Sequence, residues 1–300
     1  MSQPESPSLY SPRHWPSWLA IGLLRLLVLL PWPLLMAVGG GIGRLIGVFA
    51  KRRAHIADIN LQLCYPDMRP EARKKLIREN FAAMGKGLME VGMGWWWSHK
   101  RVEKRLVAVQ GEENLPPDDG RGTIFLTAHF SSLELSGRYL GHRSTSHAMY
   151  RPNENPVIQE MFERHRTRHT VGIISRDDVR SMIKALKAGE GVWFAPDQNF
   201  AHKGGVFADF LGVPAATNTA TSRFAGMTKS RVIPFVLFRV NGGYTLLIEP
   251  ALDDFPSDDV TNDTQRINDI YSKWAEQAPE QYNWIHRRFK TRPDNIPSPY

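Results

Sequence analysis

The sequence predicts an α/β fold: a mixed, mostly parallel central sheet flanked by helices, with a hydrophobic helical membrane anchor at the N-terminus. Three observations lead to this prediction. Apolar, strand-like runs alternate with amphipathic, helix-like stretches over most of the chain, an order that builds a parallel sheet covered on both faces. Two long apolar stretches precede residue 51. The composition, 42% hydrophobic and 23% charged, is that of a folded chain.

The two N-terminal apolar stretches, residues 15–31 and 34–50, predict membrane attachment. Arg25 and the prolines near position 31 interrupt the first, the second is rich in glycine, and no clear signal-peptide cleavage pattern follows. A single span, a re-entrant pair, an interfacial anchor and a pair of core helices are all compatible with this pattern. The basic run at 51–53 favours a cytoplasmic position for the rest of the chain. We expect a tail and anchor in 1–53 and the main domain in 54–300.

The elements of the main domain follow in order. Residues 54–68 read as a connector, and 71–97 as a long helix because apolar residues recur at helical spacing. Short runs rich in β-branched and aromatic residues predict strands at 106–110, 123–128, 146–150, 171–174, 191–195, 231–238 and 243–248. Helical patterns separate them at 133–140, 156–168, 179–188, 217–227 and 264–277.

The segment after the second predicted strand holds the main candidates for chemistry. His129 lies just past the strand end, and Glu134 lies in the first turn of the next helix, where open α/β sheets place their active sites. An imidazole with a nearby carboxylate makes a hydroxyl nucleophilic near pH 7. No Gly-x-Ser-x-Gly nucleophile is nearby, so the pattern favours a base acting on a substrate hydroxyl. Alternatively, Ser131 and Glu134 form a capping box and His129 is structural.

Three arginines are candidates for anion binding. Arg151 follows the third predicted strand in a stiff, proline-flanked loop at the same sheet edge as His129. Arg166 and Arg168 belong to the basic cluster 164–169 at a helix end, where cations also stabilise the helix terminus without any ligand. We favour anion binding for the cluster, and a surface loop arginine is the alternative for Arg151.

Asp197 and the C-terminal segment complete the candidates. Asp197 follows the fifth predicted strand and would orient His129, contact a polar group of the substrate or make a turn. Residues 284–293 combine aromatic and basic side chains, a pattern that suits a lipid head-group surface or an acidic protein, with a solvated tail as the alternative.

Charge and cysteine content exclude several classes of function. The net charge of +8 favours anionic partners, but no nucleic-acid-binding motif or phosphate loop is present, so we expect no nucleic acid partner. The single Cys64 excludes an intrachain disulfide and a thiolate metal cluster. No group of residues has close metal-ligand spacing, and we expect no metal.

The motifs together resemble the late acyltransferases of lipid A biosynthesis, and most closely their lauroyltransferase branch. The histidine–four residues–acid motif alone is shared by many glycerolipid acyltransferases. The resemblance becomes specific with segments spread over nearly the whole chain: Lys51-Arg52-Arg53-Ala54, Asn60-Leu61-Gln62-Leu63-Cys64-Tyr65-Pro66, Gly87-Leu88-Met89-Glu90-Val91-Gly92, Tyr150-Arg151-Pro152-Asn153, Met182–Lys187, Ala195-Pro196-Asp197 and His286–Pro293.

The resemblance implies an acyltransferase domain in 54–300 that moves a fatty acyl group, lauroyl in this branch, from acyl carrier protein. The acceptor would be a hydroxyl of a 3-hydroxyacyl chain on the Kdo-modified, tetraacylated lipid A precursor, at the cytoplasmic face of the bacterial inner membrane. It implies His129 as the base, Glu134 as its partner, and no cofactor beyond the acyl carrier protein donor. Arg151, Arg166 and Arg168 would bind the anionic groups of the acceptor.

Three alternatives are also compatible with the sequence. The first is an acyltransferase with a glycerophospholipid-type acceptor. The second is a thioesterase or phospholipase that uses the same histidine and glutamate with water. The third is a non-catalytic protein that binds the membrane surface.

Overall fold

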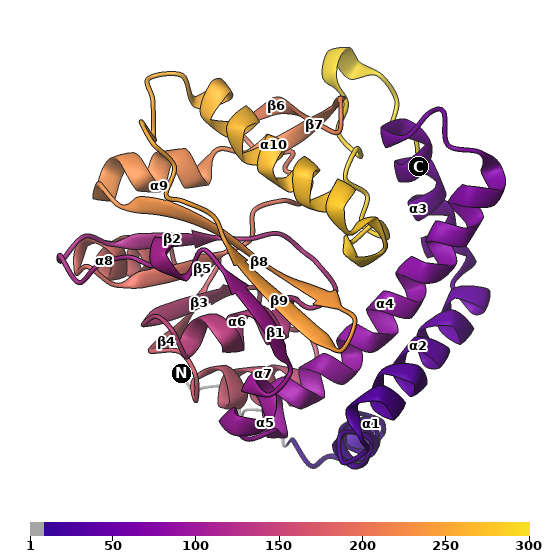
Figure 1. Cartoon of the computed structure of the whole chain (residues 1–300). Helices are drawn as coiled ribbons and strands as arrows, with labels where there is room; N and C mark the ends of the chain where they lie inside the picture. Colours follow the sequence, from indigo (N-terminus) through magenta and orange to yellow (C-terminus); the bar gives the residue numbers. More distant parts are fainter. Residues whose placement is uncertain (1–8) are drawn as a thin grey trace, which may run out of the picture.

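A computed structural model describes residues 9–300 and has a seven-stranded central sheet in the order β1-β9-β8-β2-β5-β3-β4 (Figure 1). Neighbouring strands are parallel except for the antiparallel pair of β8 and β9, so the mixed, mostly parallel sheet is confirmed. The strands are β1 (Leu106–Gln110), β2 (Thr123–Leu126), β3 (Ser146–Tyr150), β4 (Gly172–Ser175), β5 (Gly191–Phe194), β8 (Arg231–Val240) and β9 (Gly243–Ile248).

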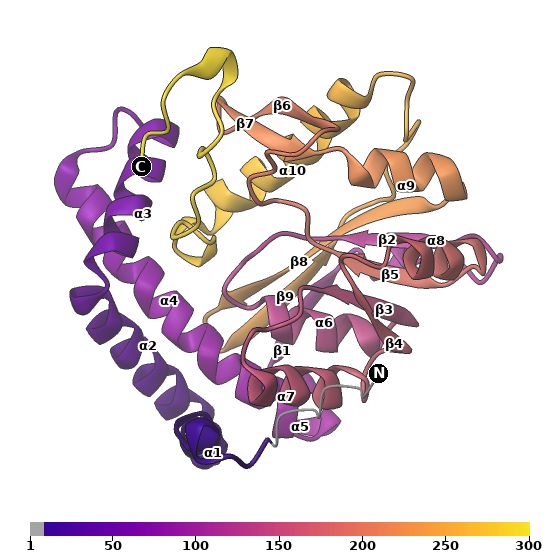
Figure 2. The same ribbon diagram turned by 180° about the vertical axis from the view of Figure 1, so that it is seen from behind.

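Helices cover both faces of the sheet (Figures 1 and 2). The helices of the described residues are α1 (Trp15–Leu27), α2 (Trp32–Phe49), α3 (Lys51–Cys64), α4 (Pro70–Trp96), α5 (His99–Glu103), α6 (Leu133–Gly141), α7 (Pro156–Arg166), α8 (Val179–Lys187), α9 (Ala220–Thr228) and α10 (Val260–Gln277), of which α1, α2 and α3 pack against α4. Because successive side chains of a strand point to opposite faces of the sheet, β2 contributes side chains to two hydrophobic cores. Ile124 and Leu126 join the core of α8, α9 and α10, whereas Phe125 joins the core of α2, α4 and α6.

Two sequence expectations are wrong. The connector expected at 54–68 is mostly helix α3, whose buried side has few apolar residues: Ile56, Ala57 and Leu61 are each at most 2% exposed. The helix expected to start at residue 217 begins at Ala220, because β7 (Val213–Asn218) pairs with β6 (Gly205–Phe210) in a separate two-stranded sheet. Residues 1–8 of the expected tail lie outside the described residues. The expected boundary at 53/54 falls inside α3 and stays a prediction.

Helix α2 lies along α4 through a contact made of glycines (Figure 1). A Cβ atom added to Gly43 would be 2.0 Å from the backbone oxygen of Phe81, and one added to Gly85 would be 2.1 Å from the oxygen of Gly39. The two backbones therefore meet at a distance that only glycine permits. Within the described residues, α2 is long and apolar enough to cross a membrane.

Candidate functional site

The site begins at the carboxyl ends of the neighbouring parallel strands β2 and β5. Leu126 ends β2 opposite Phe194, which ends β5, and the third residue after each is His129 and Asp197 respectively. The imidazole Nδ1 of His129 contacts Asp197 Oδ1, and the backbone N–H of His129 donates to Asp197 Oδ2 at 3.0 Å. The His129 side chain is 31% exposed and that of Asp197 only 2%, so solvent reaches the imidazole and not the carboxylate.

Asp197 sets both the tautomer and the charge of His129. Burial lowers the pKa of His129, but the charge and hydrogen bond of Asp197 outweigh it, so the pKa lies above its ordinary value. Burial raises the pKa of Asp197, but the charge and hydrogen bonds of His129, with the charge of Arg288, hold it below its ordinary value. With Nδ1–H donating to the carboxylate, Nε2 is left to accept a proton.

Four further hydrogen bonds join the segment 129–132, here called the His129 loop, to the C-terminal segment and β8. Asn283 N–H donates to the oxygen of His129 at 3.0 Å, and Ser131 N–H donates to the oxygen of Gln281 at 2.8 Å. The hydroxyl of the buried Ser132 donates to Leu237 O at 2.5 Å, and Ser131 Oγ accepts from the guanidinium of Arg239 at 3.2 Å. The C-terminal segment and β8 therefore fix the direction of the histidine.

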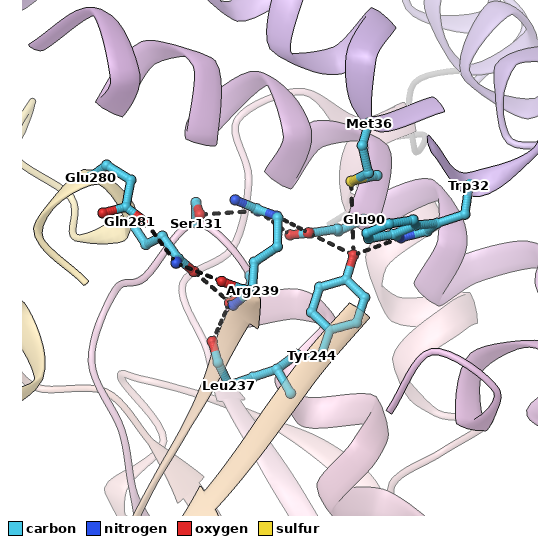
Figure 3. Close-up of polar contacts among 10 residues, drawn as sticks. Trp32, Met36, Glu90, Ser131, Leu237, Arg239, Tyr244, Glu280 and Gln281 are labelled. Carbon is cyan, nitrogen blue, oxygen red and sulfur yellow. Dashed lines mark hydrogen bonds and ion pairs between the residues drawn. The ribbon is translucent and has the colours of Figure 1, made fainter. Parts of the chain in front are cut away.

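Arg239 belongs to a buried network that reaches the N-terminal helices (Figure 3). Its guanidinium makes two bonds to Glu90 of α4, at 2.6 and 2.7 Å, and the Glu90 side chain is 0% exposed. The hydroxyl of Tyr244 donates to Glu90 at 2.8 Å and accepts from Trp32 Nε1 of α2 at 3.4 Å. Side-chain contacts thus run from α2 through this ion pair to Ser131 in the His129 loop (Figure 3).

The C-terminal segment lies behind Asp197. Arg288 is 3% exposed and donates to the backbone oxygen of Ala216 at 2.9 Å. Burial lowers the pKa of His286 to about 4; the charges of His129 and Arg288 lower it further, and the charge of Asp197 opposes them. Nε2 of His286 accepts a hydrogen bond from the backbone N–H of Asn199 at 3.2 Å. Because Arg288 is buried, the expectation that the basic residues of 284–293 face a lipid or protein surface is wrong for it.

Glu134 does not hold His129, and this expectation is wrong. Its carboxylate accepts from the guanidinium of Arg166, with Nη2 to Oε2 at 2.6 Å and Nε to Oε2 at 3.1 Å. Between the histidine and the glutamate the chain turns inward at the buried Phe130 and enters α6 at Leu133, which directs Glu134 to α7. Arg166 is therefore already paired, and its binding of substrate stays a prediction.

The capping-box alternative is also wrong. The residue that caps α6 is Ser132 and not Ser131, and it makes no side-chain bond to the helix backbone. The short polar residues of the His129 loop bind β8 instead of the first turn of α6. Glu134 therefore does not serve as part of a cap for α6.

The structure does not bring the three candidate arginines together. Arg151 is exposed just after β3, and within the described residues no hydrogen bond or ion pair holds its guanidinium. Arg168 lines a cavity of about 560 Å³, and Arg166 lines a narrow side chamber of about 20 Å³ next to it. In the part of the chain that the structure describes, no group of three or more His, Cys, Asp or Glu side chains could hold a metal ion.

The chain is similar to known proteins over nearly its whole length. The family described as bacterial lipid A biosynthesis acyltransferase matches residues 3–291. The chain is 41% identical to the lipid A biosynthesis lauroyltransferase of Escherichia coli (strain K12), over 98% of each chain. It is 40% identical to the lipid A biosynthesis palmitoleoyltransferase of the same organism, over 94% of this chain and 93% of that protein. A crystal structure of the 1-acyl-sn-glycerophosphate acyltransferase from Thermotoga maritima matches with a TM-score of 0.39 and 13% identity, over 82% of this chain and 99% of that chain.

Proposed function

The chain belongs to the bacterial lipid A biosynthesis acyltransferase family, and on that premise we propose that it transfers a lauroyl group from acyl carrier protein to a lipid A precursor. The acceptor is the hydroxyl of a 3-hydroxyacyl chain on the Kdo-modified, tetraacylated precursor. One observation carries the chemistry: a partly exposed imidazole whose Nδ1 is held by a buried carboxylate, at the carboxyl edge of the sheet. This arrangement suits a general base for a substrate hydroxyl.

The proposed mechanism uses His129 and Asp197. Nε2 of His129 takes the proton of the acceptor hydroxyl as the oxygen attacks the thioester carbonyl. Asp197 stabilises the imidazolium that forms, as the carboxylate of a catalytic triad does. The tetrahedral intermediate collapses, the carbon–sulfur bond breaks, and the imidazolium returns the proton to the departing thiolate. The products are the ester and the free thiol of the carrier protein, and the reaction needs no cofactor beyond the acyl donor.

A transfer assay with the purified full-length protein tests this proposal. Lauroyl carrier protein and the tetraacylated precursor are supplied in detergent micelles, and mass spectrometry follows the acylated product. The variant His129→Ala should lose activity by about 10²- to 10⁴-fold, the usual contribution of a positioned base, while its thermal melting stays close to that of the parent. Near-parental activity in a folded His129→Ala protein would disprove the mechanism. Transfer to lysophosphatidic acid alone, or acyl release without acceptor, would replace it with one of the alternatives.

We also propose that α1 and α2 attach the protein to one leaflet of the membrane and do not span it. The side chains of Leu19, Leu23 and Leu26 on α1 are 58–74% exposed, and Phe49 at the end of α2 is 77% exposed. Helix α2 cannot cross the bilayer alone, because its glycine contact ties it along α4, and α4 carries exposed charges such as Lys75 and Glu79. If α2 crossed the bilayer, these charges of α4 would have to enter the hydrocarbon layer, which is energetically unfavourable. An interfacial position keeps the leucines in lipid and the charges in water.

Binding to phosphatidylglycerol vesicles in a sedimentation assay tests this position. Replacing Leu19, Leu23 and Leu26 together by serine should release most of the protein, because each exposed leucine contributes about 1.5–3 kcal/mol of burial in lipid. The control replaces two exposed valines outside α1 by serine, Val107 and Val171, which are 59% and 53% exposed. Equal release by both sets of substitutions would rule out α1 as the anchor. The cytoplasmic orientation follows from the basic run after α2 and is tested by protease access to sealed vesicles of either orientation.

The donor and the acceptor differ in how the chain recognises them. The net charge of +8 favours an acidic protein donor such as acyl carrier protein. For the acceptor, Arg151 and Arg168 are exposed, so their guanidinium groups are accessible to phosphate or carboxylate. Arg166 can reach such a group only if it exchanges or shares its contact with Glu134.

A further inference from the structure

The cavity of about 560 Å³ lies beside α1, the end of α4 and α7, and His129 is not among its lining residues. Four arginines line it: Arg25 on α1, Arg138 on α6, Arg164 in the last turn of α7, and Arg168 two residues after the end of α7. No Asp or Glu lines it among the described residues. Like charges gathered without a counter-charge are unfavourable unless an anion is bound, and guanidinium groups are the preferred partners of phosphate.

In the buried wall of the cavity, two hydrogen-bond donors have no partner among residues 9–300. Arg138 is 5% exposed; its terminal nitrogens bond the backbone oxygens of Gly94 and Trp97, at 2.5 and 2.6 Å, but its Nε–H has no acceptor. Trp95 is also 5% exposed, and its Nε1–H has no acceptor either. A buried donor without a partner costs about 1–3 kcal/mol. Both residues line the cavity, and an anion bound there could satisfy them.

The two histidines of the cavity are neutral near pH 7, so they add no charge of their own. Burial, together with the charges of Arg168 and Arg164, lowers the pKa of His165 to about 4. Burial, with the charge of Arg138 first among the neighbours, lowers the pKa of His169 to about 4. The bound anion must therefore offset the charge of the arginines, and a phosphate monoester, with close to two negative charges at pH 7, does so better than a single carboxylate.

The surroundings of the cavity indicate that this phosphate is carried on a lipid. Arg25 lies on α1, the helix with the exposed leucines, and its guanidinium is 5.5 Å from the ring centre of Trp96. The cavity and the side chamber share the walls of Trp95 and Arg138, and the chamber is also lined by Glu134, in the helix that follows the His129 loop. A lipid lying in the membrane at α1 would thus meet the cavity with its head group.

We propose that this cavity is the binding site for a phosphate group of the lipid acceptor, an assignment that rests on the proposed function. The arginines hold the phosphate, and Trp95 and Trp96 form an aromatic wall beside it. The phosphate is bound apart from the reacting hydroxyl, so the site sets the position of the acceptor rather than the chemistry.

Direct binding to the full-length protein in detergent micelles tests the assignment without turnover. The fluorescence of the cavity tryptophans reports binding of the tetraacylated precursor and of the same lipid after enzymatic dephosphorylation. Arg164→Ala and Arg25→Ala, on separate helices and both exposed, should each weaken binding of the phosphorylated lipid about tenfold. Both variants should bind the dephosphorylated lipid as weakly as the parent does. Arg223→Ala, an exposed arginine on α9 outside the cavity lining, should bind like the parent.

Two competing probes identify the source of the phosphate. Phosphatidic acid and inorganic phosphate are each added at the concentration of the precursor. Weak competition by both supports the acceptor. Competition by phosphatidic acid as strong as by the precursor would overturn the assignment in favour of a membrane phospholipid. If Arg164→Ala and Arg25→Ala lost as much affinity for the dephosphorylated lipid as for the phosphorylated lipid, the phosphate site itself would be overturned. Phosphate-dependent binding without any transfer would refute only the proposed function.

Discussion

Replacing Asp197 by asparagine separates the two carboxylates that compete for the role of partner to His129. The substitution keeps the size of the side chain and removes the charge that raises the pKa of the imidazole. It also weakens two contacts, those with Nδ1 and with the backbone N–H of His129. Charge-assisted hydrogen bonds contribute about 1.5–3 kcal/mol each, and replacing a triad aspartate by asparagine costs about 10⁴-fold in rate. We expect Asp197→Asn to lower kcat by about 10²- to 10⁴-fold.

The pH profile gives the sign of the effect. Transfer requires neutral His129, so the rate of the parent rises as the pH passes upward through the raised pKa of this histidine. Without the charge of Asp197 the burial of His129 dominates and its pKa falls. The acidic limb of kcat/KM should therefore move to lower pH in Asp197→Asn, together with the loss of kcat.

Glu134→Gln is the matched control, because it removes the charge of the other candidate carboxylate and also keeps the size of the side chain. It should leave the acidic limb in place, since Glu134 contacts Arg166 and not the imidazole. The assay is transfer at saturating donor from pH 5 to 9 in a constant-ionic-strength buffer. A shifted limb in Glu134→Gln with an unshifted limb in Asp197→Asn would refute the assignment of the base and its partner.

Two further predictions concern stability. Breaking the buried ion pair by Glu90→Gln or Arg239→Met should lower the free energy of unfolding by about 3–5 kcal/mol, because each substitution leaves a buried charge unpaired. Urea unfolding should show that the double variant loses less stability than the sum of the two single variants. Gly43→Ala should lower the melting temperature, because its Cβ would meet a backbone oxygen at 2.0 Å, whereas Gly41→Ala, with no atom within 4 Å of the new Cβ, should raise it by reducing the entropy of the unfolded chain. An equal response of the two glycines in calorimetry would show that α2 does not pack on α4 in solution.

The strands were predictable because burial on both faces of a sheet leaves a continuous apolar run. The expected strands at 123–128, 191–195 and 231–238 match β2, β5 and β8 to within two residues, and most residues of these strands are buried. Those at 106–110, 146–150 and 243–248 coincide with β1, β3 and β9, which are less completely buried. Helix α3 was not predictable in the same way. It buries only a narrow face, and its charged residues, such as Lys51 and Arg52, hide the apolar pattern. The antiparallel pairing of β6 with β7, and the packing of β6 against α10, depend on tertiary structure that no local pattern reveals.

The roles at the site depended on tertiary structure to different degrees. The structure places His129 and Asp197 each three residues after the end of a strand, and the adjacency of β2 and β5 turns that equal spacing into contact. Spacing along the chain instead favours Glu134, five residues from the histidine. A loop of four residues can direct the two side chains to different neighbours, however, and the inward turn at Phe130 does so. Two groups that end adjacent parallel strands in register are thus better candidates for an acid–base pair than two groups close in sequence. Given only the order of the strands in the sheet, this rule selects Asp197 over Glu134 as the partner of His129.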